Sequence, residues 1–197
     1  HHSFVKTYRD GYEDSLRINN FFTPLRSRLT VPALTDDQRR YGKAYNGIKL
    51  PIMIDTSTNG ICQDFVIGTE NSQHTLITGG TGSGKSRFLQ MIISSIIMNY
   101  HPDDVELWLI DCKKVEFKKF LELRPQHVRL VSLERTQDFT FAFLDYRQEF
   151  AGKRTKLFME NGVTNIKDYR RVKNDPYCMP RVVIVIDEFH AITTNVN

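Results

Sequence analysis

A glycine-rich run in the middle of the chain has the residue types and the spacing of a phosphate-binding loop. It reads Gly79-Gly80-Thr81-Gly82-Ser83-Gly84-Lys85-Ser86 and continues with Arg87. The run matches G-x-x-x-x-G-K-[ST], in which glycines let backbone N–H groups turn towards phosphate oxygens. In this pattern the lysine reaches the β- and γ-phosphates of a nucleotide, and the last hydroxyl ligates Mg²⁺. We therefore predict that residues 79–87 bind ATP, with Lys85 on its phosphates and Ser86 on Mg²⁺.

Two adjacent acidic residues could complete a hydrolytic site. Asp187 and Glu188 follow a nearly continuous apolar run, residues 181–186. In a parallel α/β sheet the carboxyl ends of the strands line the crevice where ligands bind. We predict that Asp187 holds Mg²⁺ and that Glu188 polarises the water attacking the γ-phosphate. The alternative is that the two acids only cap the next helix, and the glycine-rich loop in the same chain disfavours it.

Three further polar residues stand near strand ends, and their roles are open. Asp111 and Lys113 follow another apolar run, residues 105–110. They could face the nucleotide, face a neighbouring subunit, or form a local ion pair. His190 completes the order Asp-Glu-Phe-His, which superficially matches the D-E-x-H motif of superfamily-two helicases. A lone histidine is more often structural than catalytic, so we favour a structural role for it.

The elements that must position these residues follow from hydrophobic patterning. A strand at residues 74–78 and a helix at 87–100 would flank the loop, which places the phosphates at a helix N-terminus. Further strands are expected at residues 50–54, 61–67, 105–111, 128–133 and 181–188, and further helices at 115–123, 138–161 and 165–172. The first two strands flank a hairpin turn at residues 56–60. Apolar strands that alternate with helices indicate an α/β fold, with a mostly parallel sheet covered on both faces.

The N-terminal quarter differs from the rest. Residues 1–49 show no clean period, and their short apolar pieces are broken by proline. We predict an arm or linker that docks on a core, beginning with a purification-tag remnant at His1 and His2. Residues 50–197 are then the catalytic domain.

Composition excludes several classes of protein. The chain has 197 residues, of which 40% are hydrophobic and 25% charged, as in ordinary globular proteins. Its longest apolar stretch, residues 88–98, is interrupted by polar residues and too short to cross a bilayer. The three cysteines are far apart and form no C-x-x-C pair, which favours a reducing, cytoplasmic compartment. A net charge of +4 does not by itself demand a nucleic-acid partner.

Four blocks of the sequence resemble signatures of the FtsK/SpoIIIE family of P-loop motors. Residues 74–86 resemble H-x-L-[IV]-x-G-x-T-G-S-G-K-S, 101–116 resemble H-P-x-x-V-x-L…L-I-D-x-K-x-V-E, 162–169 resemble G-V-x-N-I-x-x-Y, and 179–189 resemble L-P-x-I-V-V-V-I-D-E-F. The blocks occur in the right order and cover about residues 50–192. The second block also weakens the superfamily-two helicase reading, because those helicases lack it.

The resemblance implies a RecA-like ATPase core that assembles as a homo-hexameric ring and drives double-stranded DNA through its channel. It also implies that Lys113 lies near a nucleotide site shared between subunits, and that any membrane contact comes through segments outside this sequence. The sequence ends at Asn197, before the family's sensor strand, its trans-acting arginine and its DNA-reading winged helix. We therefore expect a truncated motor domain that hydrolyses ATP weakly, or not at all, by itself.

Two other functions stay open. One is a protein-export motor similar to the FtsK-like ATPases of type VII secretion. Residues 157–163 fit both families, but residues 113–116 favour the DNA translocase, since export motors tend to have glycines after that lysine. The other is a degenerate module that binds nucleotide only to regulate assembly. The presence of Lys85, Ser86, Asp187 and Glu188 argues against it.

Overall fold

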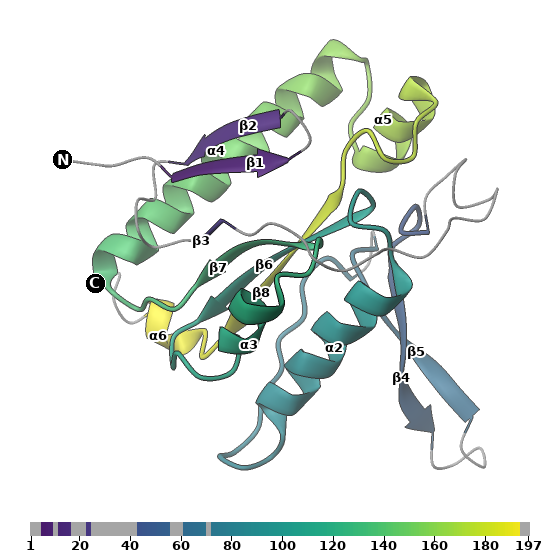
Figure 1. Cartoon of the computed structure of the whole chain (residues 1–197). Helices are drawn as coiled ribbons and strands as arrows, with labels where there is room; N and C mark the ends of the chain where they lie inside the picture. The colour runs from purple at the N-terminus through teal and green to yellow at the C-terminus, as the bar shows by residue number, and fades with distance from the viewer. Residues whose placement is uncertain are drawn as a thin grey trace.

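The computed structural model describes residues 5–9, 12–16, 23–24, 43–55, 61–69 and 72–193 (Figure 1). Five strands come first, and helices and strands then mostly alternate. In order they are β1 (Val5–Arg9), β2 (Tyr12–Leu16), β3 (Thr23–Pro24), β4 (Ile48–Asp55), β5 (Ile61–Ile67), α2 (Lys85–Asn99), β6 (Val105–Asp111), α3 (Lys118–Leu123), β7 (Val128–Ser132), α4 (Gln137–Glu160), α5 (Ile166–Lys173), β8 (Arg181–Asp187) and α6 (His190–Thr193). None of the helices described here is long and apolar enough to span a bilayer.

A four-stranded sheet with the order β3-β7-β6-β8 forms the centre of the molecule. Strand β6 runs parallel to both β7 and β8, and β3 joins β7 in the antiparallel direction. Strands β6 and β8 pair in step from Val105 and Arg181 to Asp111 and Asp187. The predicted α/β class with a mostly parallel sheet is therefore confirmed, and two aspartates end side by side at one edge.

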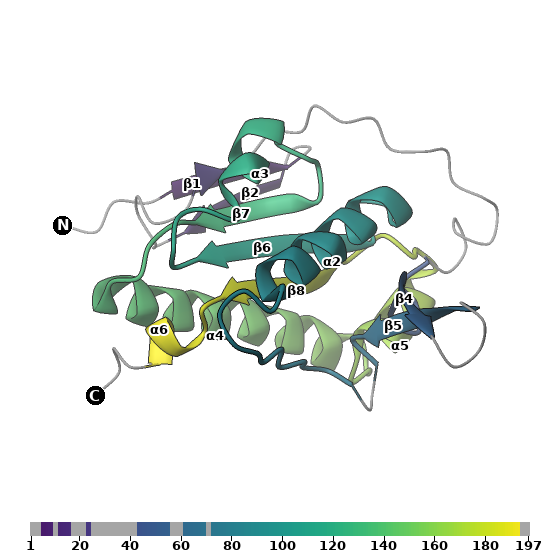
Figure 2. The same ribbon diagram turned by 90° about the horizontal axis from the view of Figure 1, so that it is seen from below.

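Helices cover both faces of this sheet, as Figures 1 and 2 show for α2 and α4. Alternate side chains of β6 serve the two faces, since successive strand residues point to opposite sides. Leu107 and Leu109 pack in one cluster with Ile93 of α2. Trp108 lies in the other cluster with Phe139 of α4. The elements between the glycine-rich loop and β8 thus pack around a well-filled hydrophobic core.

The prediction of a strand at residues 74–78 is wrong. These residues have no strand conformation, and the side chain of Leu76 is 76% exposed. A strand needs a neighbour that accepts and donates its backbone hydrogen bonds, and no strand in the described part of the chain pairs with this stretch. Strand β8 has only β6 beside it in the described sheet, and most of its side chains are only half-buried.

The predicted hairpin is confirmed, because β4 and β5 pair in the antiparallel direction. Its turn, residues 56–60, lies outside the described residues. The structure also contains strands that the sequence did not predict. Strands β1 and β2 form an antiparallel pair, and β3 attaches to β7. The division of the chain at residue 50 stays a prediction.

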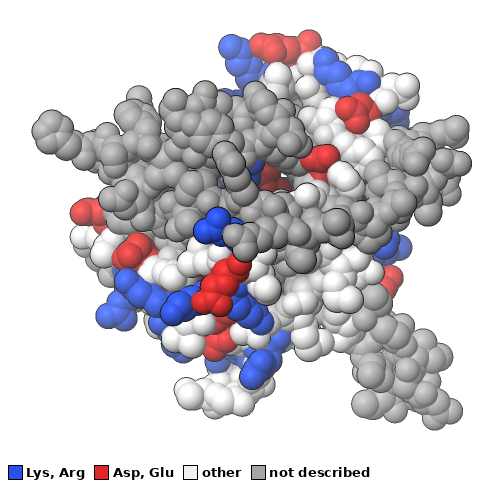
Figure 3. Space-filling model, viewed as in Figure 1, with Lys and Arg blue, Asp and Glu red and all other residues white. Residues whose placement is uncertain are grey.

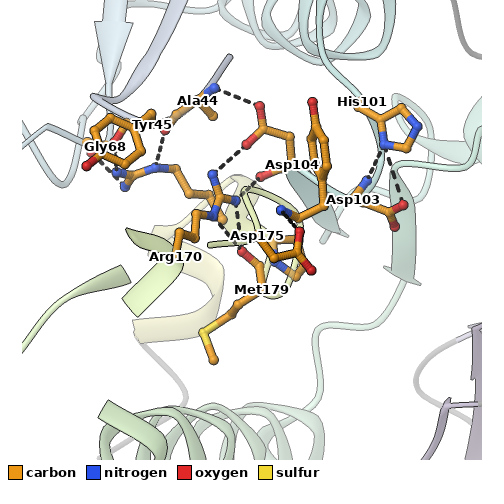
Figure 4. Close-up of polar contacts among 12 residues, drawn as sticks. Ala44, Tyr45, Gly68, His101, Asp103, Asp104, Arg170, Asp175 and Met179 are labelled. Atoms are coloured by element: carbon orange, nitrogen blue, oxygen red, sulfur yellow. Dashed lines mark hydrogen bonds and ion pairs between the residues drawn. The ribbon is translucent and has the colours of Figure 1, made fainter. Parts of the chain in front are cut away.

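A buried ion pair joins distant segments at the amino ends of β6 and β8 (Figure 4). The Arg170 Nη1 of α5 lies 2.7 Å from the Asp104 Oδ1, and the side chains are 2% and 1% exposed. The other Asp104 oxygen accepts the backbone N–H of Ala44 at 2.7 Å. Arg181 donates to the carbonyls of Ala44 and Tyr45. Because each buried charge has several partners, this cluster fixes where residues 43–46, α5 and β8 meet.

Candidate functional site

The glycine-rich loop adopts a conformation that its glycines permit. Gly82 and Gly84 have φ values of 79° and 93°, in the region that other residues avoid. A Cβ added at Gly79 would lie 2.6 Å from the Ser83 Oγ, so a larger residue there would require the Ser83 side chain to move. Thr81 and the other residues at positions 79–84 are exposed to solvent. The loop is therefore an open backbone turn that leads directly into α2.

Helix α2 begins at Lys85 with no acidic side chain in its first turn and no side-chain hydrogen bond at its N-cap, Gly84. The first N–H groups of a helix and the helix dipole together favour an anion at this end. The Lys85 Nζ donates to the carbonyls of Gly79 at 2.7 Å and Gly80 at 3.0 Å. An ammonium and the start of a helix thus face the same loop. This arrangement can hold a phosphate chain.

The first turn of α2 meets the end of β8 through Ser86. The Ser86 Oγ donates to the Asp187 Oδ2 at 3.3 Å. Asp187 is 3% exposed, and burial raises its pKa, with further contributions from the charges of Asp111 and Glu188. Such a carboxylate is stabilised by a cation. Mg²⁺ in nucleotide sites uses one or two carboxylates together with phosphate oxygens, so Ser86 and Asp187 fit this metal.

No group of three or more histidine, cysteine or acidic side chains that could hold a metal ion is found in the described part of the chain.

Glu188 has its backbone in the left-handed region, with φ at 60°, which is uncommon outside glycine. Its Oε1 forms an ion pair with the Lys113 Nζ, and its Oε2 lies 3.2 Å from the His190 Nδ1. The hydrogen bond from Lys113 lowers the pKa of Glu188. The predicted water-polarising residue therefore stands next to Asp187, with a cation on one of its two oxygens.

Asp111 organises the loop that carries Lys113. Its buried carboxylate accepts the backbone N–H groups of Lys113 at 3.0 Å, Glu116 at 2.7 Å and Phe117 at 3.0 Å. These bonds explain why α3 begins at Lys118 rather than at the expected residue 115. Of the three arrangements left open for Lys113, the structure shows an ion pair, but with Glu188 rather than with Asp111.

Arg87 points along its own helix, with its Nη1 3.5 Å from the Gln90 Oε1. Gln90 in turn donates to the Glu116 Oε2 at 2.6 Å, which links α2 to the loop after β6. Neither Gln90 nor Glu116 was predicted as a site residue. No local signal marks them, because their contact depends on how α2 packs against that loop.

The model of the FtsK/SpoIIIE family matches residues 37–196. The chain belongs to the FtsK/SpoIIIE family. The matched range contains the glycine-rich loop, the segment from Asp111 to Lys113 and the two acids after β8. The FtsK/SpoIIIE resemblance stated from the four sequence blocks is therefore confirmed.

Individual FtsK/SpoIIIE relatives match over most of the chain. The chain is similar to the DNA translocase FtsK of Clostridium tetani, with 30% identity over 77% of the chain and 20% of that protein. It is 36% identical to the DNA translocase FtsK of Clostridium acetobutylicum over 58% of the chain and 15% of that protein. It is 31% identical to the ESX secretion system protein YukB of Bacillus subtilis over 59% of the chain and 8% of that protein.

The chain spans about a fifth or less of the length of these relatives. No solved structure matches it.

Proposed function

We propose that this chain is the ATP-hydrolysing motor domain of a translocase that moves double-stranded DNA. The observation that carries the proposal is the 3.3 Å contact between Ser86 and Asp187, which brings the glycine-rich loop to the acidic end of β8. A phosphate-binding helix start, a hydroxyl and two carboxylates then converge on one spot. Phosphoryl transfer needs mainly such positioning and charge neutralisation.

The residues divide the work as follows. Backbone N–H groups of residues 79–84 and of the first turn of α2 bind the phosphates of ATP. Arg87 is the last residue of this phosphate-binding segment. The Lys85 ammonium leaves the carbonyls of Gly79 and Gly80 for the β- and γ-phosphates. Ser86 and Asp187 hold Mg²⁺, which neutralises phosphate charge when bound. Glu188 orients and polarises the attacking water.

The DNA substrate is supported by the relatives, several of which are named DNA translocases. We propose that six copies of the full-length protein form a ring around the duplex, with residues 50–197 as the motor domain and residues 1–49 as an arm. Charge alone does not support a DNA surface on the face in Figure 3, where basic and acidic side chains lie next to one another around α3. Similarity to the named DNA translocases is therefore what supports DNA as the substrate.

A DNA-stimulation assay tests this function. ATP turnover by the full-length protein is measured with and without duplex DNA, beside the Lys85→Ala variant as a control that lacks the phosphate-binding ammonium. We expect duplex DNA to raise turnover several-fold in the wild type and to leave the variant inactive. Unchanged turnover with DNA would contradict the proposal.

Protein export is the second candidate. The observation in its favour is the 31% identity to YukB, an ESX secretion system protein. The same assay separates the two functions if DNA is replaced by the C-terminal tail of a secreted protein. Stimulation by the tail and not by DNA would establish export.

A further inference from the structure

Glu188 is engaged at both of its carboxylate oxygens. The Lys113 Nζ pairs with Oε1, and the His190 Nδ1 lies 3.2 Å from Oε2. The glutamate side chain is 16% exposed, whereas the lysine side chain is 59% exposed. A carboxylate that polarises a water needs an oxygen directed at that water. The arrangement seen here directs both oxygens at protein cations or donors.

The position of Lys113 is set by its loop. The Asp111 carboxylate holds three backbone N–H groups of residues 113–117. The contact between Gln90 and Glu116, at 2.6 Å, ties the same loop to the helix that follows the glycine-rich loop. The loop backbone is therefore anchored at several points. Only the exposed end of the Lys113 side chain is left to swing away from Glu188.

Both partners of this ion pair lie beside backbone strain. Glu188 has a φ of 60°, and Lys114, the residue after Lys113, has a φ of 63°. Neither is glycine, so each conformation is less favourable than the right-handed or extended one. Strain of this kind persists only where the surroundings hold it, and it gathers at sites that switch between arrangements. The contact to Lys113 is one of the interactions that hold Glu188 there.

We propose that Lys113, together with His190, holds Glu188 in a resting arrangement and that ATP hydrolysis requires Lys113 to release it. The inference rests on the proposed function, because it assigns a regulator to the same hydrolytic site. Lys113 is in this view a positioning residue that acts through Glu188. Loss of the Lys113 ammonium releases Glu188, so the protein without DNA hydrolyses ATP faster.

The test compares Lys113→Met with Lys114→Met in the full-length protein without DNA. Lys114 is the matched control because it is the next residue, equally charged and similarly exposed, and pairs with Glu134 at 3.4 Å instead of Glu188. We expect Lys113→Met to raise kcat several-fold with an unchanged KM for ATP, and Lys114→Met to leave both unchanged. Lys113→Arg, which keeps the cation, should keep the low rate. An equal or lower kcat in Lys113→Met overturns the proposal.

A second measurement needs no hydrolysis. The nuclear magnetic resonance signal of the Lys113 ammonium reports its ion-pair partner. Glu188→Gln should shift this signal and leave the Lys114 ammonium signal in place, whereas Glu134→Gln should do the reverse. A Lys113 signal that is unchanged by Glu188→Gln overturns the proposed contact between Lys113 and Glu188, even in a preparation that does not hydrolyse ATP. A wild type that binds no ATP would instead count against the proposed function, so the two failures are distinguishable.

Discussion

Ser86 and Asp187 stand 101 positions apart in the chain, and their side chains meet at 3.3 Å. The contact joins the first turn of α2 to the last residue of β8. Neither residue can be placed beside the other from local sequence, since the contact requires β8 to lie next to β6 and α2 to pack on the sheet.

Replacing Asp187 by asparagine should weaken the Mg²⁺ dependence of nucleotide binding. Asparagine keeps the size of the side chain but removes the charge that stabilises the metal. We expect the Mg²⁺ concentration for half-maximal binding of a fluorescent ATP analogue to rise by about tenfold or more. Asp145→Asn, an exposed position on α4, is the control and should leave it unchanged.

Glu188→Gln should abolish turnover and keep nucleotide binding. The amide retains the shape of the carboxylate but cannot draw a proton from water. We expect kcat to fall by about 100-fold or more, as is usual for loss of a general base. Equilibrium binding of the ATP analogue should stay within the wild-type range. Normal hydrolysis by this variant would remove Glu188 from its assigned role.

Breaking the buried ion pair should destabilise the fold. Arg170→Met leaves the Asp104 carboxylate in the interior without the guanidinium that lies 2.7 Å from it. Loss of one partner of a buried pair costs about 3–5 kcal/mol of unfolding free energy. Arg171→Met is the matched control, because the neighbouring Arg171 pairs with Asp168 at the surface, where such pairs contribute about 1 kcal/mol or less. Urea unfolding of both variants checks the difference.

Two of the three cysteines, Cys112 and Cys178, should differ in reactivity. Cys112 is buried and Cys178 is exposed. Burial and the charges of Asp111 and Asp187 raise the pKa of the Cys112 thiol to about 11. The thiolate is the reactive form, so at pH 8 only about one Cys112 in a thousand is ready to react. Mass spectrometry should show iodoacetamide on Cys178 before Cys112. The labelling rate of Cys112 should rise about tenfold per pH unit below pH 11.

The order of most strands and helices was predictable, because short apolar runs in the sequence mark their positions. Strands β6 and β8 and helix α2 lie within a few residues of their expected bounds. The prediction of a strand at residues 74–78 was wrong because an apolar run shows β-propensity but does not show whether another strand lies beside it to pair with. Such a segment forms a strand only where a partner strand can accept and donate its backbone hydrogen bonds.

The polar contacts were less predictable than the elements. Arg170 and Arg171 are adjacent in the sequence and chemically identical, yet one is buried on Asp104 and the other is exposed. The helix phase decides this, because Arg170 lies on the buried side of α5 with Tyr169. Likewise, the spacing of Asp111 and Lys113 could not show that Lys113 turns to Glu188, which enters only with the pairing of β6 and β8.

The open side of β8 has a practical consequence. In the described sheet β8 is hydrogen-bonded along one edge only, and its sequence is Arg-Val-Val-Ile-Val-Ile-Asp. A long apolar strand with an unpaired edge is a template onto which another chain can add. A preparation of this chain alone should aggregate as its concentration rises, and its shelf life would depend more on shielding that strand than on its net charge of +4.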